Sequence, residues 1–378
     1  MNTSNTLPNT ESPRQYSIFD NFICKQSAFE FFNSEIQFLL SECGASKGNV
    51  ISVAVSGGSD SIALLIMAAN WARANDTKII CVTVDHKIRD ESREEAVFVR
   101  DFCKSFDIKH VILEWDRSSI EDANLRKSNL ENMAREARYK LISDFCEKNS
   151  VKFLLTGHTW NDQLETFEMR KLSSSSDFGL AGMSRIRTLS KNLILLRPIL
   201  HFTKEYLKNF LINENVEWKN DPMNDCETFK RVACRKKILT YDEKTLSDLY
   251  KKIKELGKTR NEIEMQAVKF LKDEKSCFFS YLGHAVLNHS SFNEEEKKVQ
   301  SEIIKRVVWN IGGKKYATNI NEDILEKIIS RKINTIGRCL FKINKRSISI
   351  FRENRNKTFG LSCVSGNNKV DLFDVFSY

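Results

Sequence analysis

The feature that most constrains the fold is an apolar run that enters a turn with two glycines and continues into an apolar helix. Residues 49–55 (NVISVAV) predict a buried strand, residues 56–61 (SGGSDS) form the turn, and residues 62–74 predict the helix. Strand, turn and helix in this order open a βα unit. Such a turn presents backbone N–H groups and the positive end of a helix to an anion, so it predicts a phosphate-binding site.

The same alternation continues along the first part of the chain. Apolar, strand-like segments are followed each time by a segment with helical character. The expected strands are residues 78–84, 110–113, 152–156 and 193–196, and the expected helices are residues 91–106, 130–147, 162–171 and 203–213. This alternation predicts an α/β fold in which a parallel sheet is covered by helices on both faces.

The texture changes after residue 225. Lys-rich helical segments (230–258 and 294–308) replace the alternation, and residues 338–352 predict one or two strands. We therefore expect a flexible tail at 1–20, an α/β domain at 21–225, a smaller, mainly helical domain at 226–355 with short terminal strands, and a C-terminal extension at 356–378. The serine run at 173–176 predicts a mobile loop.

Composition excludes several classes of protein. Hydrophobic residues make up 41% and charged residues 29% of the 378 residues, which is ordinary for a soluble globular chain and excludes disorder as the main state. The longest apolar stretches fall well short of the roughly 18 residues that span a bilayer, and the polar first fifteen residues predict no export signal. None of the ten cysteines forms a C-x-x-C pair, so we expect reduced thiols in a cytoplasmic protein. The net charge of +9 favours an anionic partner, above all nucleic acid.

The glycine turn is specific among phosphate-binding loops. The chain contains neither G-x-x-x-x-G-K-[ST] nor G-x-G-x-x-G, so neither a Walker P-loop nor a dinucleotide fingerprint is supported. Residues 56–61 instead resemble the SGGxDS fingerprint of the PP-loop ATP pyrophosphatase superfamily. The resemblance implies cleavage of ATP between the α and β phosphates to adenylate a substrate.

Further motifs are similar to those of the tRNA(Ile)-lysidine synthetase family, in order, from residue 49 to about 237. They are VDHKIR (84–89) with ES (91–92), NLE (129–131) with AREARY (134–139), TGHT (156–159) with NDQLET (161–166), GLAGM (179–183), RP (197–198), and Asp221, Pro222, Asn224, Asp225, Phe229, Arg231 and Arg235. The chain departs from the family pattern at four places. Asn161 replaces an Asp, Lys87 replaces a Gly, Val232 replaces an Asn, and serines fill the loop at 173–176.

The resemblance implies the reaction. The base oxygen of the wobble cytidine in a CAU-anticodon tRNA(Ile) would attack the α-phosphorus of ATP, and free L-lysine would then displace AMP. The protein would be an ATP-dependent ligase forming a C–N bond, with ATP and Mg²⁺ as cofactors and with tRNA(Ile) and L-lysine as partners. Its oligomeric state stays open, with a homodimer as one arrangement.

The resemblance also implies the site residues. The ATP-binding residues would be Ser56, Gly57, Gly58, Ser59, Asp60, Ser61 and His158. The catalytic residues would be Asp60, Arg138, Asp162 and Glu165, with Asp60 and Asp162 also as metal ligands. Asp162 and Glu165 are three residues apart near a helix start, so they share a face and could hold Mg²⁺ or orient the ammonium of lysine.

Each of these residues also has a purely structural alternative. Asp60 could only cap its helix, and Asp162 with Glu165 could be a solvated pair at a helix N-terminus. Arg138 suits a bidentate grip on a phosphate or a base carbonyl, but it could instead form a surface ion pair. His158 follows a buried strand at the end where α/β sheets place ligands, but it could be a satisfied structural histidine.

A basic cluster opens the helical domain. We expect Arg231, Arg235, Lys236 and Lys237 to bind tRNA phosphates, while the α/β domain receives the anticodon. For any one of these residues, a solvated helix surface is the alternative. Three other functions also stay open: a PP-loop tRNA thiolase, an asparagine or GMP synthetase, and a non-catalytic RNA-binding protein with a relic loop. The missing C-x-x-C, the missing glutaminase domain and the unbroken SGGSDS turn argue against them in that order.

Overall fold

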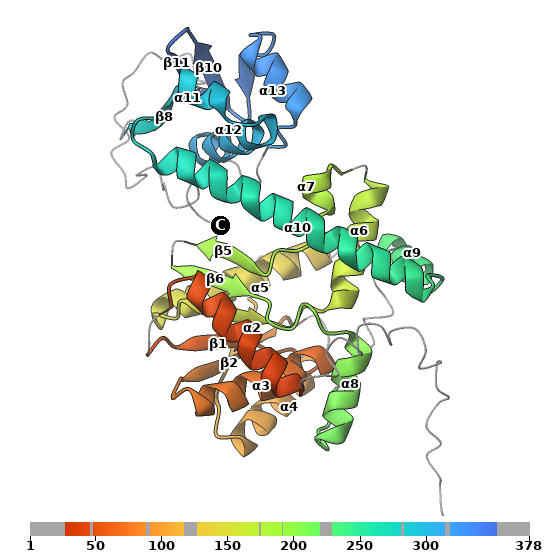
Figure 1. Ribbon diagram of the computed structural model, residues 1–378. Helices are drawn as coiled ribbons and strands as arrows, with labels where there is room; N and C mark the ends of the chain where they lie inside the picture. The colour runs from red at the N-terminus through yellow and green to blue at the C-terminus, as the bar shows by residue number, and fades with distance from the viewer. Residues whose placement is uncertain are drawn as a thin grey trace, which may run out of the picture. The chain divides into compact units, whose positions relative to one another are not determined.

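The computed structural model describes residues 27–45, 48–87, 91–116, 127–173, 175–190, 192–219, 229–280, 283–313 and 318–353, without the side chains of 91, 127–132, 229 and 230. These residues belong to two compact units, one up to Gly257 and one from Lys258 onward, which are considered separately (Figure 1). The tail expected at 1–20, the extension expected at 356–378, and the motif residues 221–225 lie outside the described residues. No helix in the described ranges has the length and apolar character needed to cross a membrane.

The first unit is built on a six-stranded sheet. Its strands are β1 (Ile51–Ala54), β2 (Ile79–Asp85), β3 (Lys109–Glu114), β4 (Phe153–Thr156), β5 (Ile186–Ser190) and β6 (Leu193–Leu196), in the order β3-β2-β1-β4-β6-β5. All neighbours pair in parallel except β5, which is antiparallel to β6 at one edge. The parallel α/β sheet expected from the sequence is therefore confirmed, with one additional antiparallel strand.

Helices cover both faces of this sheet. They are α2 (Ala28–Glu42), α3 (Ser59–Ala74), α4 (Glu91–Ser105), α5 (Lys127–Lys148), α6 (Trp160–Leu172), α7 (Asp177–Leu180) and α8 (Lys204–Asn213). Neighbouring residues of a strand face opposite sides. On β4, Leu155 accordingly packs into a core with α2, α3, α4 and α8, whereas Leu154 packs into a second core with α5.

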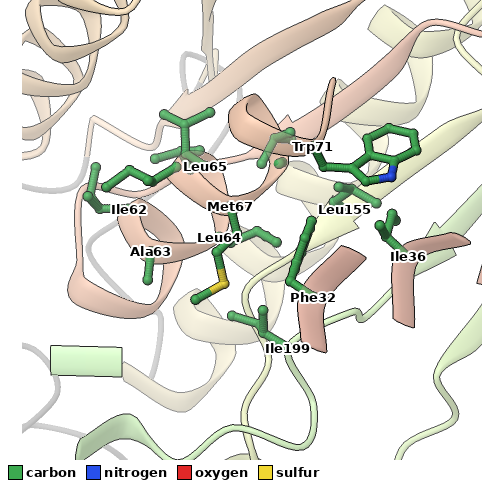
Figure 2. Packing of buried hydrophobic residues seen from close by; sticks show 14 of the residues in the cluster. Phe32, Ile36, Ile62, Ala63, Leu64, Leu65, Met67, Trp71, Leu155 and Ile199 are labelled. Carbon is green, nitrogen blue, oxygen red and sulfur yellow. The ribbon is translucent and has the colours of Figure 1, made fainter. Parts of the chain in front are cut away.

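The core that contains α3 fixes the start of that helix. Figure 2 shows Phe32 of α2 beside Leu64 and Met67 of α3, and Ile36 of α2 near Leu155 of β4, within a larger cluster that also contains Ile199. From Ser61 to Ala69 every residue of α3 is buried. Because α3 is held by burial on all sides, the turn that precedes it has a fixed position above the sheet.

The first unit continues beyond residue 225, where the sequence predicts a new domain. Helix α9 (Phe229–Ile238) and the first part of α10 (Glu243–Lys272) pack on α6 through a small apolar core. This core joins Trp160, Leu164 and Phe167 of α6 to Ile238, Leu246 and Ile253. The many lysines of this stretch lie on the outer face of the helices, and they hide the apolar stripe that makes α9 part of the α/β unit.

The second unit contains more sheet than its sequence indicates. Besides α11 (His289–Glu294), α12 (Lys297–Gly312) and α13 (Glu322–Ile329), it has an antiparallel sheet of five strands in the order β7-β8-β11-β10-β9. The strands are β7 (Cys277–Ser280), β8 (His284–Asn288), β9 (Thr335–Ile336), β10 (Cys339–Ile343) and β11 (Ser347–Arg352). The sequence predicted one or two strands at residues 338–352, and these are β10 and β11. The other three strands have only two to five residues each, too few for a clear alternation of apolar and polar positions.

Candidate active site

The SGGSDS turn follows β1 directly and leads into the first turn of α3. Gly57 has φ = +91°, a left-handed conformation that glycine adopts without steric cost. Gly58 is the N-cap of α3, and no side chain caps that helix end. The hydroxyl of Ser61 closes the turn, since it donates to the carbonyl of Gly58 at 2.9 Å and accepts the Ser56 N–H at 3.2 Å. The first N–H groups of α3 are therefore left for an anion.

The loop after β4 lies against this turn. Strands β1 and β4 are neighbours, and the chain passes from β1 to β2 on the other side, so the crevice between β1 and β4 is where a parallel sheet binds ligands. Gly157 follows β4, and a Cβ atom there would lie 3.3 Å from the carbonyl carbon and oxygen of Asp60 and from the Cα of Ser61. Only a glycine lets the β4 loop approach the start of α3 this closely.

Three helix N-termini meet at this crevice. Asp60 lies in the first turn of α3, Asp162 in the first turn of α6, and Lys204 is the first residue of α8. The Lys204 Nζ atom is 3.8 Å from Asp60 Oδ2 and 3.6 Å from Asp162 Oδ1. The structure therefore brings together the two carboxylates expected to bind metal, with a lysine ammonium between them.

The two carboxylates have different acidities. Burial, together with the charge of Asp162, raises the pKa of Asp60 to about 6 although Lys204 opposes the shift. Burial also opposes ionisation of Asp162, but Lys204, His158 and hydrogen bonds from Thr159 outweigh it, so the pKa of Asp162 lies below its usual value. The same two carboxylates raise the pKa of Lys204 despite its burial. At neutral pH the group is a cation between two anions.

Asp162 has a structural function as well as a place in the site. Its Oδ2 atom accepts the Thr159 N–H at 2.7 Å and the Thr159 hydroxyl at 2.9 Å, which fixes the start of α6. The other oxygen, Oδ1, faces Lys204. The capping alternative and the functional interpretation of Asp162 therefore hold together, each through a different oxygen.

Asn161 anchors α8 to α6. Its side-chain oxygen accepts the backbone N–H of Lys204 at 2.9 Å, and the Trp160 N–H donates to the Phe202 carbonyl at 2.8 Å. Only an acceptor oxygen is needed at position 161, and Asn supplies it as well as Asp does. The departure from the family pattern at this position therefore keeps the contact that the structure uses.

His158 follows β4, and Arg138 of α5 contacts the loop that follows β2. The Nδ1 atom of His158 is 2.9 Å from the hydroxyl of Thr156, and burial, aided by the charge of Arg197, lowers the pKa of His158 to about 4. Arg138 of α5 donates through Nε to the Nε2 atom of His86, at 3.1 Å, just after β2. Burial, with Arg138 as the next cause, lowers the pKa of His86 to about 4, so this ring is a neutral acceptor at pH 7.

The loop after β2 contains a second departure from the family pattern. Lys87, where the family pattern has Gly, has φ = +49°, a left-handed conformation that disfavours a side chain. Its N–H donates to Asp85 Oδ1 at 2.9 Å and its Nζ atom lies 2.8 Å from Glu114 Oε2. These contacts offset part of the backbone strain.

The GLAGM segment is held by α6. Gln163 binds the backbone of Met183 with both ends of its amide, accepting the N–H at 2.6 Å and donating to the carbonyl at 3.0 Å. Arg170 donates to the carbonyls of Gly179, at 2.5 Å, and Gly182, at 2.9 Å. The glutamine of NDQLET therefore positions the segment that follows α7.

Two of the four predicted tRNA-binding residues form ion pairs with α6. Arg235 Nε donates to Glu165 Oε1 at 2.6 Å, and Lys237 Nζ donates to Glu168 Oε2 at 2.6 Å. Glu168, whose side chain is 1% exposed, also accepts the Tyr241 hydroxyl at 2.7 Å. Arg235 and Lys237 thus join α9 to α6, whereas Lys236 is exposed and Arg231 is half-buried. Glu165 lies in the same helix as Asp162 but faces Arg235.

The donor set of the crevice fits Mg²⁺. Asp60 and Asp162 offer hard carboxylate oxygens within 4 Å of one point, the Lys204 Nζ atom. Mg²⁺ is commonly held by one or two carboxylates, with substrate phosphates and water completing its shell. No group of three or more His, Cys, Asp or Glu side chains suited to a metal ion occurs in the described part of the chain, so a cage made by protein alone is not found there.

Comparison with known proteins identifies the family. A family model described as "PP-loop domain" matches residues 29–241. The tRNA(Ile)-lysidine synthase of Rickettsia felis is 30% identical over 331 residues, which cover 86% of this chain and 74% of that protein. The chain belongs to the tRNA(Ile)-lysidine synthase family. The enzymes of that name from Rickettsia akari (31% identical, 86% and 74% covered) and Orientia tsutsugamushi (28% identical, 85% and 74% covered) are similar over the same extent.

Membership of the lysidine synthase family confirms the recognition made from the motifs and makes the chain an ATP-dependent ligase of the PP-loop class. The fold is also shared with a solved structure, the U34-tRNA thiolase of Methanococcus maripaludis. The TM-score is 0.52 and the identity 13%, over 62% of this chain and 81% of that chain. At this identity the likeness concerns the fold alone.

The motifs of the lysidine synthase family do not point to Lys204, so the sequence did not predict it as a site residue. A lysine at the start of a helix is ordinary in a sequence with 59 Lys and Arg residues. The one available signal was its place at the start of the helix that follows the strand-like segment 193–196, at the carboxyl edge of a parallel sheet. The functions of Asn161 and Gln163 in placing α8 and the GLAGM segment were likewise visible only in the structure.

Proposed function

We propose that this ligase attaches free L-lysine to the wobble cytidine of CAU-anticodon tRNA(Ile), through an adenylated cytidine, with release of pyrophosphate and AMP. The names of its relatives support tRNA(Ile) as the substrate. The observation that carries the proposal is the convergence of Asp60, Asp162 and Lys204 beside the uncapped start of α3. This arrangement suits the phosphates of ATP together with a divalent cation.

The first step transfers adenylate. The base oxygen of the cytidine attacks the α-phosphorus, and the bond from that phosphorus to the β-phosphate oxygen breaks, so pyrophosphate leaves. The N–H groups of Gly58 and Ser59 and the positive end of α3 bind the phosphate oxygens. Asp60 and Asp162 would hold Mg²⁺, and a bound Mg²⁺ would neutralise the charge on those oxygens.

The second step uses lysine. Its amine attacks the activated carbon of the base, the bond from that carbon to the adenylate oxygen breaks, and AMP leaves. Asp162 and Glu165 lie on one helix three residues apart, and they orient the incoming ammonium group by charge. The ammonium form of lysine has a pKa near 10.4, so before attack it must give a proton to a placed carboxylate or to a phosphate oxygen of the bound adenylate.

The tRNA is bound through the basic residues of α9. Arg231 and Lys236 contact its phosphates. Arg235 and Lys237 hold this helix in place through their ion pairs with Glu165 and Glu168. Arg138, paired with the neutral His86, presents its guanidinium at the carboxyl end of β2 and binds a phosphate or the base carbonyl. We also propose a cytoplasmic location, which agrees with the free thiols of the seven described cysteines.

The test is incorporation of labelled lysine into tRNA transcripts by the purified protein with ATP and Mg²⁺. Label should enter CAU-anticodon tRNA(Ile) and not elongator tRNA(Met), with AMP and pyrophosphate formed. D60A should abolish AMP formation while tRNA binding persists, and D144A, at an exposed position of α5, should change neither. AMP formation without lysine transfer would contradict the proposed nucleophile. Neither product despite tRNA binding would contradict the ligase itself.

A further inference from the structure

Lys204 has no part in the steps described above, yet the site converges on its ammonium group. Nζ lies 3.6 Å from Asp162 Oδ1 and 3.8 Å from Asp60 Oδ2. These two oxygens come from different helices, and each lies at a helix N-terminus. The ammonium therefore neutralises the same two carboxylates that a divalent cation would bind.

The contacts of this ammonium are loose. Charge-assisted N–H···O bonds have lengths of about 2.7–2.9 Å, and both distances at Lys204 are longer than that. Its side chain is 32% exposed, so it is open to solvent from the crevice. A group held by charge without tight hydrogen bonds can move to a stronger anion at little cost.

The backbone of Lys204 is fixed, in contrast to its ammonium. Asn161 accepts its N–H at 2.9 Å, and the hydroxyl of Thr203 caps the first turn of α8 by accepting the Tyr206 N–H at 3.1 Å. The Cα atom therefore keeps its place beside the crevice while the four-carbon stem allows Nζ to swing. This combination suits a residue that exchanges one set of anionic partners for another.

A tethered cation and a free one compete for the same oxygens. Without nucleotide, the ammonium neutralises the two carboxylates and opposes entry of Mg²⁺ by like-charge repulsion. When ATP occupies the start of α3, its phosphates offer Lys204 several anionic oxygens within reach of the crevice. The ammonium can then leave the carboxylates, and these become available to the metal that accompanies ATP.

We propose that Lys204 binds the phosphates of ATP, and that in the nucleotide-free enzyme its ammonium closes the Asp60–Asp162 pair to free divalent cations. Metal binding thereby becomes conditional on nucleotide. The inference rests on the proposed function in that it takes Asp60 and Asp162 as the metal ligands. It adds a phosphate-binding residue and an order in which the site is filled.

The test compares binding of Mn²⁺ alone with binding of ATP in the full-length protein. Free Mn²⁺ is measured by electron paramagnetic resonance without nucleotide, and labelled ATP with Mg²⁺ by equilibrium dialysis. K204M should bind Mn²⁺ about tenfold more tightly than the wild type and ATP about ten- to hundredfold more weakly. K204R, which keeps the charge, should retain weak Mn²⁺ binding and most of the ATP affinity.

A matched control is K148M, which removes an exposed charge in the last turn of α5. It should change both affinities by less than about threefold, because exposed charges are screened. Equal Mn²⁺ affinity in the wild type and K204M, or parallel loss of Mn²⁺ and ATP binding in K204M, would overturn the inference in favour of a structural ion pair. Failure of the wild type to bind ATP would instead refute the proposed function. The Mn²⁺ comparison would still show whether the Lys204 ammonium keeps free divalent cations from the two carboxylates.

Discussion

The side-chain oxygen of Asn161 accepts the backbone N–H of Lys204 at 2.9 Å, across 43 positions of sequence. This bond joins the first turn of α6, which carries Asp162, to the first residue of α8. The relative position of Lys204 and Asp162 therefore rests partly on one neutral acceptor, together with the Trp160 N–H bond to the Phe202 carbonyl. Any residue that keeps that oxygen should keep the site.

The first prediction concerns this acceptor. N161A should lower the free energy of unfolding by about 1 kcal/mol, the usual cost of removing a cap from a helix N-terminus. It should also weaken ATP binding, because α8 loses one of the two bonds that join its start to the start of α6. N161D should keep the hydrogen bond and lose less than about 0.5 kcal/mol. Urea unfolding and ATP dialysis measure both effects. Equal damage from the two substitutions would show that the oxygen is not the decisive feature.

The second prediction concerns Gly157. An alanine Cβ there would lie 3.3 Å from the backbone of Asp60 and Ser61, so the β4 loop and the start of α3 must separate by a few tenths of an ångström. G157A should cost about 1–3 kcal/mol of stability, as overpacking usually does, and should raise the KM for ATP. G257A, within α10, is the control. The nearest atom that a Cβ at this position would meet outside its own helix backbone is the Ala181 carbonyl oxygen, at 4.0 Å. G257A should stabilise the protein by about 0.5–1 kcal/mol.

The sequence predicted the sheet and the edge of the site for a physical reason. Apolar runs such as residues 49–55 are buried on both faces of a parallel sheet, and their alternation with helices determines which ends of the strands lie together. Asp60 and Asp162 both follow such strands, so their proximity could be expected. The match of motifs then supplied the chemistry that periodicity alone does not contain.

Other features depend on contacts that charge and periodicity do not encode. Arg235 and Lys237 read as nucleic-acid ligands because they are basic, but a sequence does not reveal that Glu165 and Glu168 face them from α6. Lys204 drew no prediction as a site residue, because nothing in a sequence shows that it lies between two carboxylates from different helices. The short strands β7 and β8 have too few residues to show a period and are recognised only once they pair.

The third prediction is a coupling between Glu165 and Arg235. The ion pair has a 2.6 Å contact, and the Glu165 side chain is 11% exposed. Removing one member leaves the other poorly solvated, so E165Q and R235Q should each cost about 1–3 kcal/mol. The double variant should cost less than the sum of the two, as a double-mutant cycle in urea would measure.

The control for this coupling is the exposed pair Lys258–Glu262, whose atoms are 3.9 Å apart. Its coupling energy should be below about 0.5 kcal/mol. Independent effects of E165Q and R235Q would contradict the assignment of this pair as the contact that holds α9 on α6. If the proposed function holds, E165Q should also raise the KM for lysine, and restoring stability in the double variant should not restore it.

The fourth prediction concerns acid pH and rests on four half-buried histidines. Burial lowers the pKa of each of four rings to about 4, well below the ordinary value near 6.5; these are His86, His110, His158 and His201. Between pH 6.5 and 4 the unfolded chain holds a proton at each site that the folded protein lacks. Their stabilising contribution is therefore complete above pH 6.5 and is lost as the pH falls toward 4. Each proton contributes a slope of about 1.4 kcal/mol per pH unit.

Asp60 acts in the opposite sense within the same window. Its pKa is raised to about 6 in the folded protein, so the folded state holds a proton that the unfolded chain lacks between roughly pH 4 and 6, and its contribution to stability is lost as the pH rises through 6. The four histidines outweigh this single carboxyl, so the free energy of unfolding should fall between pH 6.5 and 5. H110Q should reduce that slope by the contribution of one proton, about 1.4 kcal/mol per pH unit. D144N, at an exposed position, should not change the slope. Urea unfolding followed by tryptophan fluorescence measures the slope, and a flat profile, or a slope unchanged by H110Q, would contradict the burial of neutral histidines as its cause.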